Sequence, residues 1–137
     1  MNDKDKELLL KDLCARLPYN VSVNYKGKIY SVLGIAHNRL VLCKPFMSQT
    51  LEYCPLVEEV KPYLFPMSSM TEEQEKEYNS LRDFVPTYHY EFGDIIEDTE
   101  LYDNFESIDY LIANHFDYRN LIPKGLAIDC TGLNIYV

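Results

Sequence analysis

The feature that most restricts the fold is the alternation of apolar and polar residues between residues 20 and 43. Val21 and Val23 alternate with polar neighbours, and turn-forming residues follow at 26–28 and at 37–38. Alternation with period two is typical of a half-buried strand, and short turns connect antiparallel neighbours. This stretch therefore predicts a three-stranded antiparallel meander.

Three further segments have the three- and four-residue apolar spacing of amphipathic helices, namely residues 3–17, 71–84 and 107–116. The first ends before Pro18, and the second begins with a capping box of Thr71 and Gln74. Asn104 or Ser107 can cap the third. The predicted buried stripes are Leu9 or Leu10 with Leu13, Cys14 and Leu17; Tyr78, Leu81 and Phe84; and Ile108, Leu111, Ile112 and Phe116.

The remaining segments have weaker signals. Four prolines between residues 45 and 68 exclude long elements, so we expect short strands or one helical turn there, with Tyr63, Leu64 and Phe65 in the core. Alternating aromatic residues predict a strand over 85–92, and Thr131-Gly132 predicts a hairpin over 126–137.

Together these elements predict an α+β protein in which a small antiparallel sheet packs against two to three helices. The 137 residues are enough for a single domain with a sizeable core, so we expect one domain over residues 1–137.

Charge is unevenly distributed along the chain, whose formal net charge is −9. Residues 17–51 contain four basic and no acidic residues, whereas residues 71–137 contain fifteen acidic and four basic residues. An acidic surface repels nucleic-acid phosphates and attracts basic partners, or simply keeps a protein in solution. A protein partner, possibly basic, is therefore favoured over nucleic acid.

The acidic residues are densest between residues 91 and 110, where apolar residues such as Ile95 and Leu101 are interleaved with them. This mixture predicts a packed, folded segment whose carboxylates imitate the phosphate row of a nucleic acid and occupy a basic protein. The alternative is a solvated face, and the spacing does not match a calcium loop. The candidate binding residues are Glu91, Asp94, Glu97, Asp98, Glu100, Asp103, Glu106 and Asp109.

A weaker candidate for chemistry consists of His115, Asp117 and Arg119. A histidine beside a carboxylate can transfer protons, and an arginine can hold an anion, which would suit a small enzyme. The simpler interpretation is structural, with His115 at a helix C-terminus and an ion pair between Asp117 and Arg119.

The meander itself supports a nucleic-acid-binding alternative. Tyr25 and Tyr30 would stack on bases while Lys26, Lys28 and Arg39 contact phosphates.

The four cysteines, Cys14, Cys43, Cys54 and Cys130, include no Cys-x-x-Cys pair. Without a secretory signal they are expected to be reduced thiols in the cytoplasm, and no run of residues is apolar enough for a membrane span. A zinc site of His37, Cys43 and Cys54 matches no standard ligand spacing, so neither a metal nor a cofactor is predicted.

Three segments, residues 13–19 (LCARLPY), 61–71 (KPYLFPMSSMT) and 115–127 (HFDYRNLIPKGLA), resemble a family of small proteins of gut anaerobic bacteria, their prophages and mobile elements. The resemblance implies a phage or mobile-element origin, and no activity, cofactor or site residue is carried over from it. Combined with the charge, it favours a non-enzymatic accessory protein that binds another macromolecule through its acidic C-terminal half.

Overall fold

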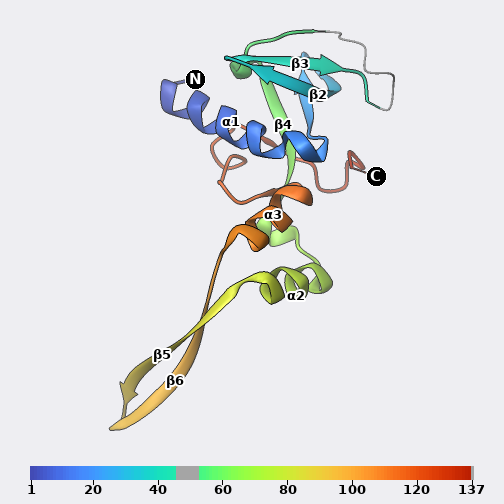
Figure 1. Ribbon diagram of the computed structural model, residues 1–137. Helices are drawn as coiled ribbons and strands as arrows, with labels where there is room; N and C mark the ends of the chain where they lie inside the picture. The colour runs from blue at the N-terminus through green and yellow to red at the C-terminus, as the bar shows by residue number, and fades with distance from the viewer. Residues whose placement is uncertain (46–52, 137) are drawn as a thin grey trace. The chain divides into compact units, whose positions relative to one another are not determined.

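The computed structural model describes residues 1–45 and 53–136. The fold is α+β, as predicted (Figure 1). The chain divides into two compact units: unit 1 contains Met1–Ser69 and Ile112–Val137, and unit 2 contains Met70–Leu111. The single domain predicted over residues 1–137 stays a prediction beside this division.

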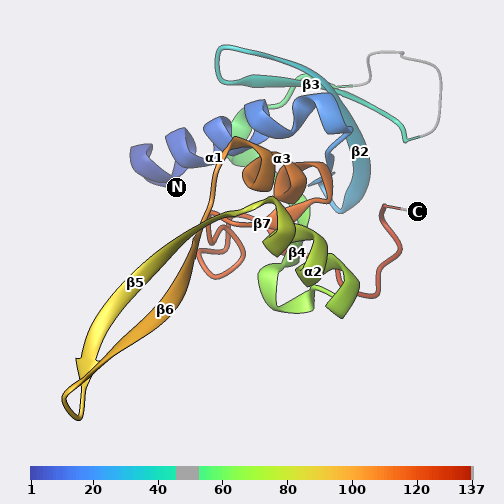
Figure 2. The ribbon, with the colours of Figure 1, turned by 60° about the horizontal axis from the view of Figure 1, so that its bottom comes forward.

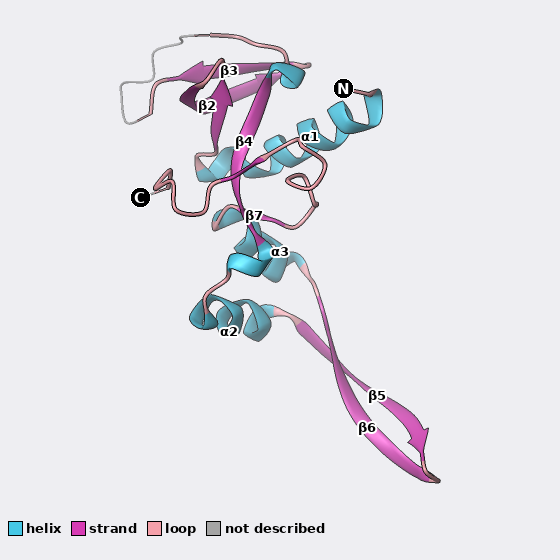
Figure 3. Cartoon of the chain, turned by 180° about the vertical axis from the view of Figure 1, so that it is seen from behind, coloured by secondary structure: helices cyan, strands magenta, loops and turns pink. Residues whose placement is uncertain are grey.

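Unit 1 is built on a sheet with strand order β3-β2-β1-β4-β7, in which β8 also pairs with β4 (Figure 3). The predicted meander is confirmed, because β1, β2 and β3 pair antiparallel with their neighbours. The short strands β7 and β8 join β4 in parallel, so the sheet is mixed. The strands are β1 (Ser22–Tyr25), β2 (Lys28–Ala36), β3 (Arg39–Cys43), β4 (Val60–Pro66), β7 (Phe116–Asp117) and β8 (Ile128–Asp129).

Helix α1 (Asp3–Arg16) supplies one side of the unit 1 core (Figure 1). Leu9 and Leu13 are fully buried in the same apolar cluster as Val23 of the sheet. The predicted stripe is wrong at Cys14, which is exposed, whereas Leu17 packs against this cluster although it begins a 3-10 helix, Leu17–Tyr19. The charged residues Asp12 and Arg16 complete the buried stripe instead. Asp12 and Arg16 lie on this stripe because they follow Leu9 and Leu13, respectively, by three residues.

The proline-rich segment contains the short elements that its composition predicts. It includes two 3-10 helices, Val57–Glu59 and Met67–Ser69, with β4 between them. Tyr63 and Leu64 of β4 are buried and Phe65 is half-buried. Part of that prediction falls on residues 46–52, which lie outside the described residues.

The predicted C-terminal hairpin over 126–137 is wrong. Residues 128–129 pair with Tyr63 and Leu64 of β4, and the following residues turn without forming a returning strand up to residue 136. Thr131-Gly132 is a turn, as predicted, but the open edge of β4 supplies the partner strand from a distant part of the chain.

Unit 2 consists of α2 (Glu72–Leu81), the hairpin of β5 (Asp83–Glu91) and β6 (Asp94–Tyr102), and most of α3 (Phe105–Ala113) (Figure 2). The predicted capping box is confirmed, since Thr71 and Gln74 bond each other's backbone N–H. However, α2 ends at Leu81 rather than at 84, because Arg82 has extended backbone and β5 begins at Asp83, where its residues pair with β6.

Helix α3 begins and ends earlier than predicted. Asn104 accepts a hydrogen bond from the Ser107 N–H at 2.9 Å, which makes Asn104 the cap. The helix ends at Ala113 because His115 has left-handed backbone, with φ of 64°, and Phe116 already belongs to β7. Leu111 and Ile112 of the predicted stripe are buried.

In the part of the chain that the structure describes, no helix combines the length and apolar character that crossing a membrane requires.

Candidate functional site

His115, Asp117 and Arg119 lie in unit 1, next to a buried ion pair that the sequence prediction missed. The Nε of Arg16 donates to Oδ2 of Asp12 at 2.7 Å, and both side chains are fully buried. The Nη2 of Arg16 donates to the carbonyl oxygen of Phe116 at 2.6 Å. A buried guanidinium in this position ties α1 to β7, and removing one partner would leave an uncompensated charge.

Each of the three predicted catalytic residues is engaged by a different partner. The two carboxylate oxygens of Asp117 accept the backbone N–H groups of Leu121 and Ile122, both at 2.9 Å. Arg119 pairs with Asp12, its Nε lying 3.3 Å from Oδ1, so the predicted local pair with Asp117 is wrong. Asp117 therefore shapes a loop, and its oxygens are occupied by backbone rather than by His115.

The His115 ring stacks on the Tyr136 ring, with centroids 3.5 Å apart and planes 8° from parallel. Its Nδ1 is buried and has no hydrogen-bond partner among the described residues. Burial and the nearby Arg16 guanidinium lower the pKa of His115 to about 4, so the ring is neutral at pH 7. A neutral, stacked imidazole without a carboxylate beside it contributes packing contacts and does not form an acid–base pair.

The meander does not present the stacking platform that nucleic-acid binding would need. Tyr25 and Tyr30 are buried, and their rings contact each other and Tyr53 at centroid distances of 5.5 to 6.1 Å. Lys26 and Lys28 are exposed, but cations alone give no base-stacking surface.

The residues weighed for a zinc site, His37, Cys43 and Cys54, form no metal cluster. Among the described residues there is no group of three or more His, Cys, Asp or Glu side chains placed to hold a metal ion. Cys43 is buried, Cys54 is exposed, and all four cysteines are free thiols.

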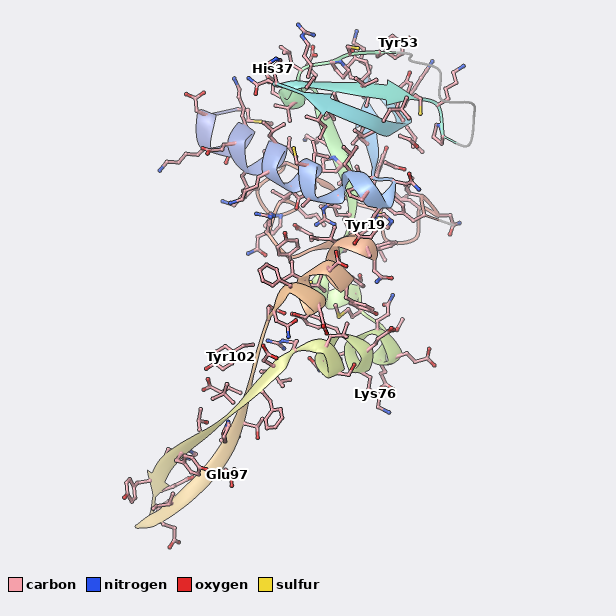
Figure 4. The ribbon with its side chains drawn as sticks, in the orientation of Figure 1. Tyr19, His37, Tyr53, Lys76, Glu97 and Tyr102 are labelled. Atoms are coloured by element: carbon pink, nitrogen blue, oxygen red, sulfur yellow. The ribbon has the colours of Figure 1, made fainter. Side chains whose placement is uncertain are left out.

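The acidic stretch forms the second strand of a hairpin that we call the arm, residues 83–102 (Figure 1). Nine consecutive pairs join its strands, from Asp83–Tyr102 at the base to Glu91–Asp94 at the tip. At about 3.4 Å per residue, the strands are about 30 Å long. Side chains project from the ribbon along its length, among them Glu97 and Tyr102 (Figure 4).

The register sorts these side chains onto two faces, because directly paired residues share a face and neighbours along a strand alternate. One face, the acidic face, carries five carboxylates, Asp83, Glu91, Asp94, Asp98 and Glu100, together with Val85, Thr87, His89, Ile96 and Tyr102. The other, the aromatic face, carries Phe84, Tyr88, Tyr90, Ile95 and Leu101, with Pro86, Thr99 and one acid, Glu97. Four of the eight predicted acids therefore share one face, joined by Asp83.

The apolar residues of the arm are exposed, which corrects the expectation that this segment is packed. Tyr90 is 79% exposed and Ile95 is 64% exposed. The segment is folded, but its strands pair only with each other within the described residues, so no second layer covers the aromatic face.

The remaining predicted acids lie at the base of the arm or beyond it. Asp103 accepts hydrogen bonds from Tyr78 at 2.5 Å and from Ser107 at 3.1 Å, and it lies 3.5 Å from the Nε of Arg82. Burial and the Asp103 carboxylate raise the pKa of Tyr78 to about 12, which keeps its hydroxyl a donor. Asp103 thus anchors the arm to α2, while Glu106 and Asp109 belong to α3.

The tip of the arm combines an exposed ring with an unfavourable backbone. Phe92 is 97% exposed and has φ of 53°, in the left-handed region, and Gly93 follows with φ of 86°. This two-residue turn requires positive φ at both positions, which Asn and Gly adopt readily and a bulky residue does not. A costly conformation that displays an apolar ring is typical of a contact surface.

In comparisons with known proteins, no family model, no curated protein and no solved structure matches the chain. The arm is therefore interpreted from its own geometry.

The first prediction concerns the turn. Replacing Phe92 with Asn should relieve about 1 kcal/mol of left-handed strain, because Asn tolerates positive φ. Amide hydrogen exchange in β5 and β6 should slow about fivefold. Lys26→Asn, in the matching β1–β2 turn where Lys26 has φ of 50°, is the control and should leave the arm unchanged. Unchanged or faster exchange in the arm of the Phe92 variant would show that its turn is not strained.

The second prediction concerns His115, whose pKa is lower in the folded than in the unfolded chain. Below pH 6.5 His115 is protonated in the unfolded chain but stays neutral in the folded chain. The free energy of unfolding therefore falls as the pH drops towards about 4. In denaturant unfolding over this pH range, the free energy of unfolding should fall by about 2 kcal/mol more for the wild type than for His115→Asn. This figure is reduced for the partial solvent exposure of His115.

Asn tolerates the left-handed backbone at this position and does not titrate. Asp12, whose pKa is raised by burial, titrates in both proteins and cancels from the difference. Parallel stability curves for the two proteins would contradict the assignment.

Proposed function

We propose that the chain is a non-enzymatic binding protein whose arm docks on a basic protein. The observation that carries this proposal is the two-faced arm, which presents five carboxylates on one exposed face and aromatic rings on the other. Apolar rings supply buried area at an interface, and carboxylates select a partner rich in Lys and Arg.

The distribution of charge between the units supports a basic partner. Unit 2 contains 13 acidic and two basic residues, a net charge of −11. Unit 1 contains nine acidic and eleven basic residues, a net charge of +2. Because the whole negative excess belongs to the unit that carries the arm, a basic partner is attracted to one part of the molecule rather than to all of it.

The accessory role in a prophage or mobile element, which the resemblance implies, is consistent with a small protein that occupies another protein. It stays a prediction, as do the cytoplasmic location and the absence of a cofactor.

The third prediction separates the arm from overall charge. A triple variant, Asp94→Asn, Asp98→Asn and Glu100→Gln, removes three carboxylates from the acidic face. We expect its affinity for poly-L-lysine to fall about tenfold, since each exposed ion contact is worth about 0.5 kcal/mol. Titration calorimetry at 50 and 300 mM salt should show affinity decreasing with salt.

The matched control removes three exposed carboxylates from α2 in the same unit, Glu72→Gln, Glu73→Gln and Glu75→Gln. This control has the same net charge as the arm variant, and its affinity for poly-L-lysine should fall less than threefold. Equal losses in the two variants would mean that total charge, not the arm, governs binding.

A further inference from the structure

The arm has one strand edge that is open and one that is blocked. The two-residue turn makes Glu91 and Asp94 a hydrogen-bonded pair, so every second residue towards the base directs its N–H and C=O outwards instead. On β5 one of these outward positions is Pro86, which has no N–H to donate. On β6 the outward residues Ile95 and Glu97 retain their N–H groups, whereas the N–H of Thr99 already donates to Oδ1 of Asp98 at 2.9 Å.

The open stretch of the β6 edge has a definite lower end. The carbonyl oxygen of Leu101 accepts a hydrogen bond from Nη2 of Arg82 at 2.9 Å, so this outward group is already satisfied. Above it, the N–H and C=O groups of Ile95 and Glu97 and the C=O of Thr99 point outwards, and the described residues supply no strand for them.

We propose that this edge accepts an extended segment of the basic partner as a third strand, in which cationic and apolar residues alternate. The inference rests on the proposed function and specifies how the partner binds. Side chains of the added strand would alternate between the two faces of the arm. Those beside Asp94, Asp98 and Glu100 would be Lys or Arg, and those on the aromatic face would be apolar.

A second copy of the chain does not fit this edge. Antiparallel pairing of two β6 strands across a two-fold axis would place Glu97 opposite its own copy, or Asp98 opposite its own copy, in two of the three central registers. The third register, centred on Thr99, would place Asp98 opposite Glu100. Like charges directly opposite each other destabilise a strand pair, so the acids of β6 direct this edge towards a cationic strand.

A third strand would also stabilise the arm itself. An isolated two-stranded hairpin is marginally stable in water, whereas three strands with an apolar face are stable together. Backbone hydrogen bonds would supply affinity, and the alternation of side chains would supply selectivity.

The fourth prediction uses a nine-residue peptide of alternating Lys and Val as the probe of the full chain. A peptide of the same composition, with its lysines in one block, should bind at least tenfold more weakly by fluorescence anisotropy. On addition of the alternating peptide, the amides of Ile95 and Glu97 should become protected from hydrogen exchange, and those of β5 should not.

Glu97→Pro removes an outward N–H and leaves the hydrogen-bonded pairs of the arm intact, as Pro86 does on β5. It should bind the alternating peptide at least tenfold more weakly than Glu97→Ala, the matched control, which also lacks the carboxylate but keeps the N–H. Alternate N-methylation of the peptide backbone tests the same bonds without altering the protein, and should reduce binding equally.

Two results would overturn the inference in distinguishable ways. If both peptides bind equally, if Glu97→Pro binds as Glu97→Ala does, and if N-methylation has no effect, the arm docks through charge alone, and the proposed function survives without the third strand. If neither peptide nor poly-L-lysine binds at 50 mM salt, the proposed function fails together with it.

Discussion

The opposite orientation of successive side chains in a β-strand is the constraint on which both units depend. In unit 1 it directs Val32, Leu40 and Leu42 into a core that α1 helps to close. In the arm the same geometry places every carboxylate except that of Glu97 on one face and every aromatic ring of the strands except Tyr102 and His89 on the other, but the described residues provide no second layer for the rings. Identical local rules therefore give a closed core in one unit and a two-faced surface in the other.

The arm is strained at its tip and held at its base. Phe92 adopts a backbone conformation that Asn or Gly would adopt more cheaply, and its ring lies in solvent. At the other end, Asp103 links Tyr78, Ser107 and Arg82, which joins the hairpin to the helices of its own unit. The base of the arm is thus anchored, whereas the backbone of its tip is locally unfavourable. This arrangement is expected of a segment whose contacts are completed by a partner.

The residues that most resemble catalytic groups serve the architecture of unit 1. Asp117 binds two backbone N–H groups, Arg119 pairs with Asp12, and His115 stacks on Tyr136. The buried Arg16–Asp12 pair contributes to the neutral state of His115. The Arg16 guanidinium donates a hydrogen bond to Phe116 of β7, and its positive charge disfavours a charge on His115. Chemistry-bearing residues beside a helix end are readily used for such local hydrogen bonds.

The sequence by itself determined the α+β class, the meander over 20–43, the capping box of α2 and the concentration of acids after residue 70. These follow from periodicity and from contacts within a few residues, which a linear pattern records. Only the tertiary structure decided which strands β4 accepts, that Asp12 and Arg16 are buried, and that the acids of the arm share one face. Those outcomes depend on register and on partners distant along the chain, and a one-residue shift in register would exchange the faces without changing any local pattern.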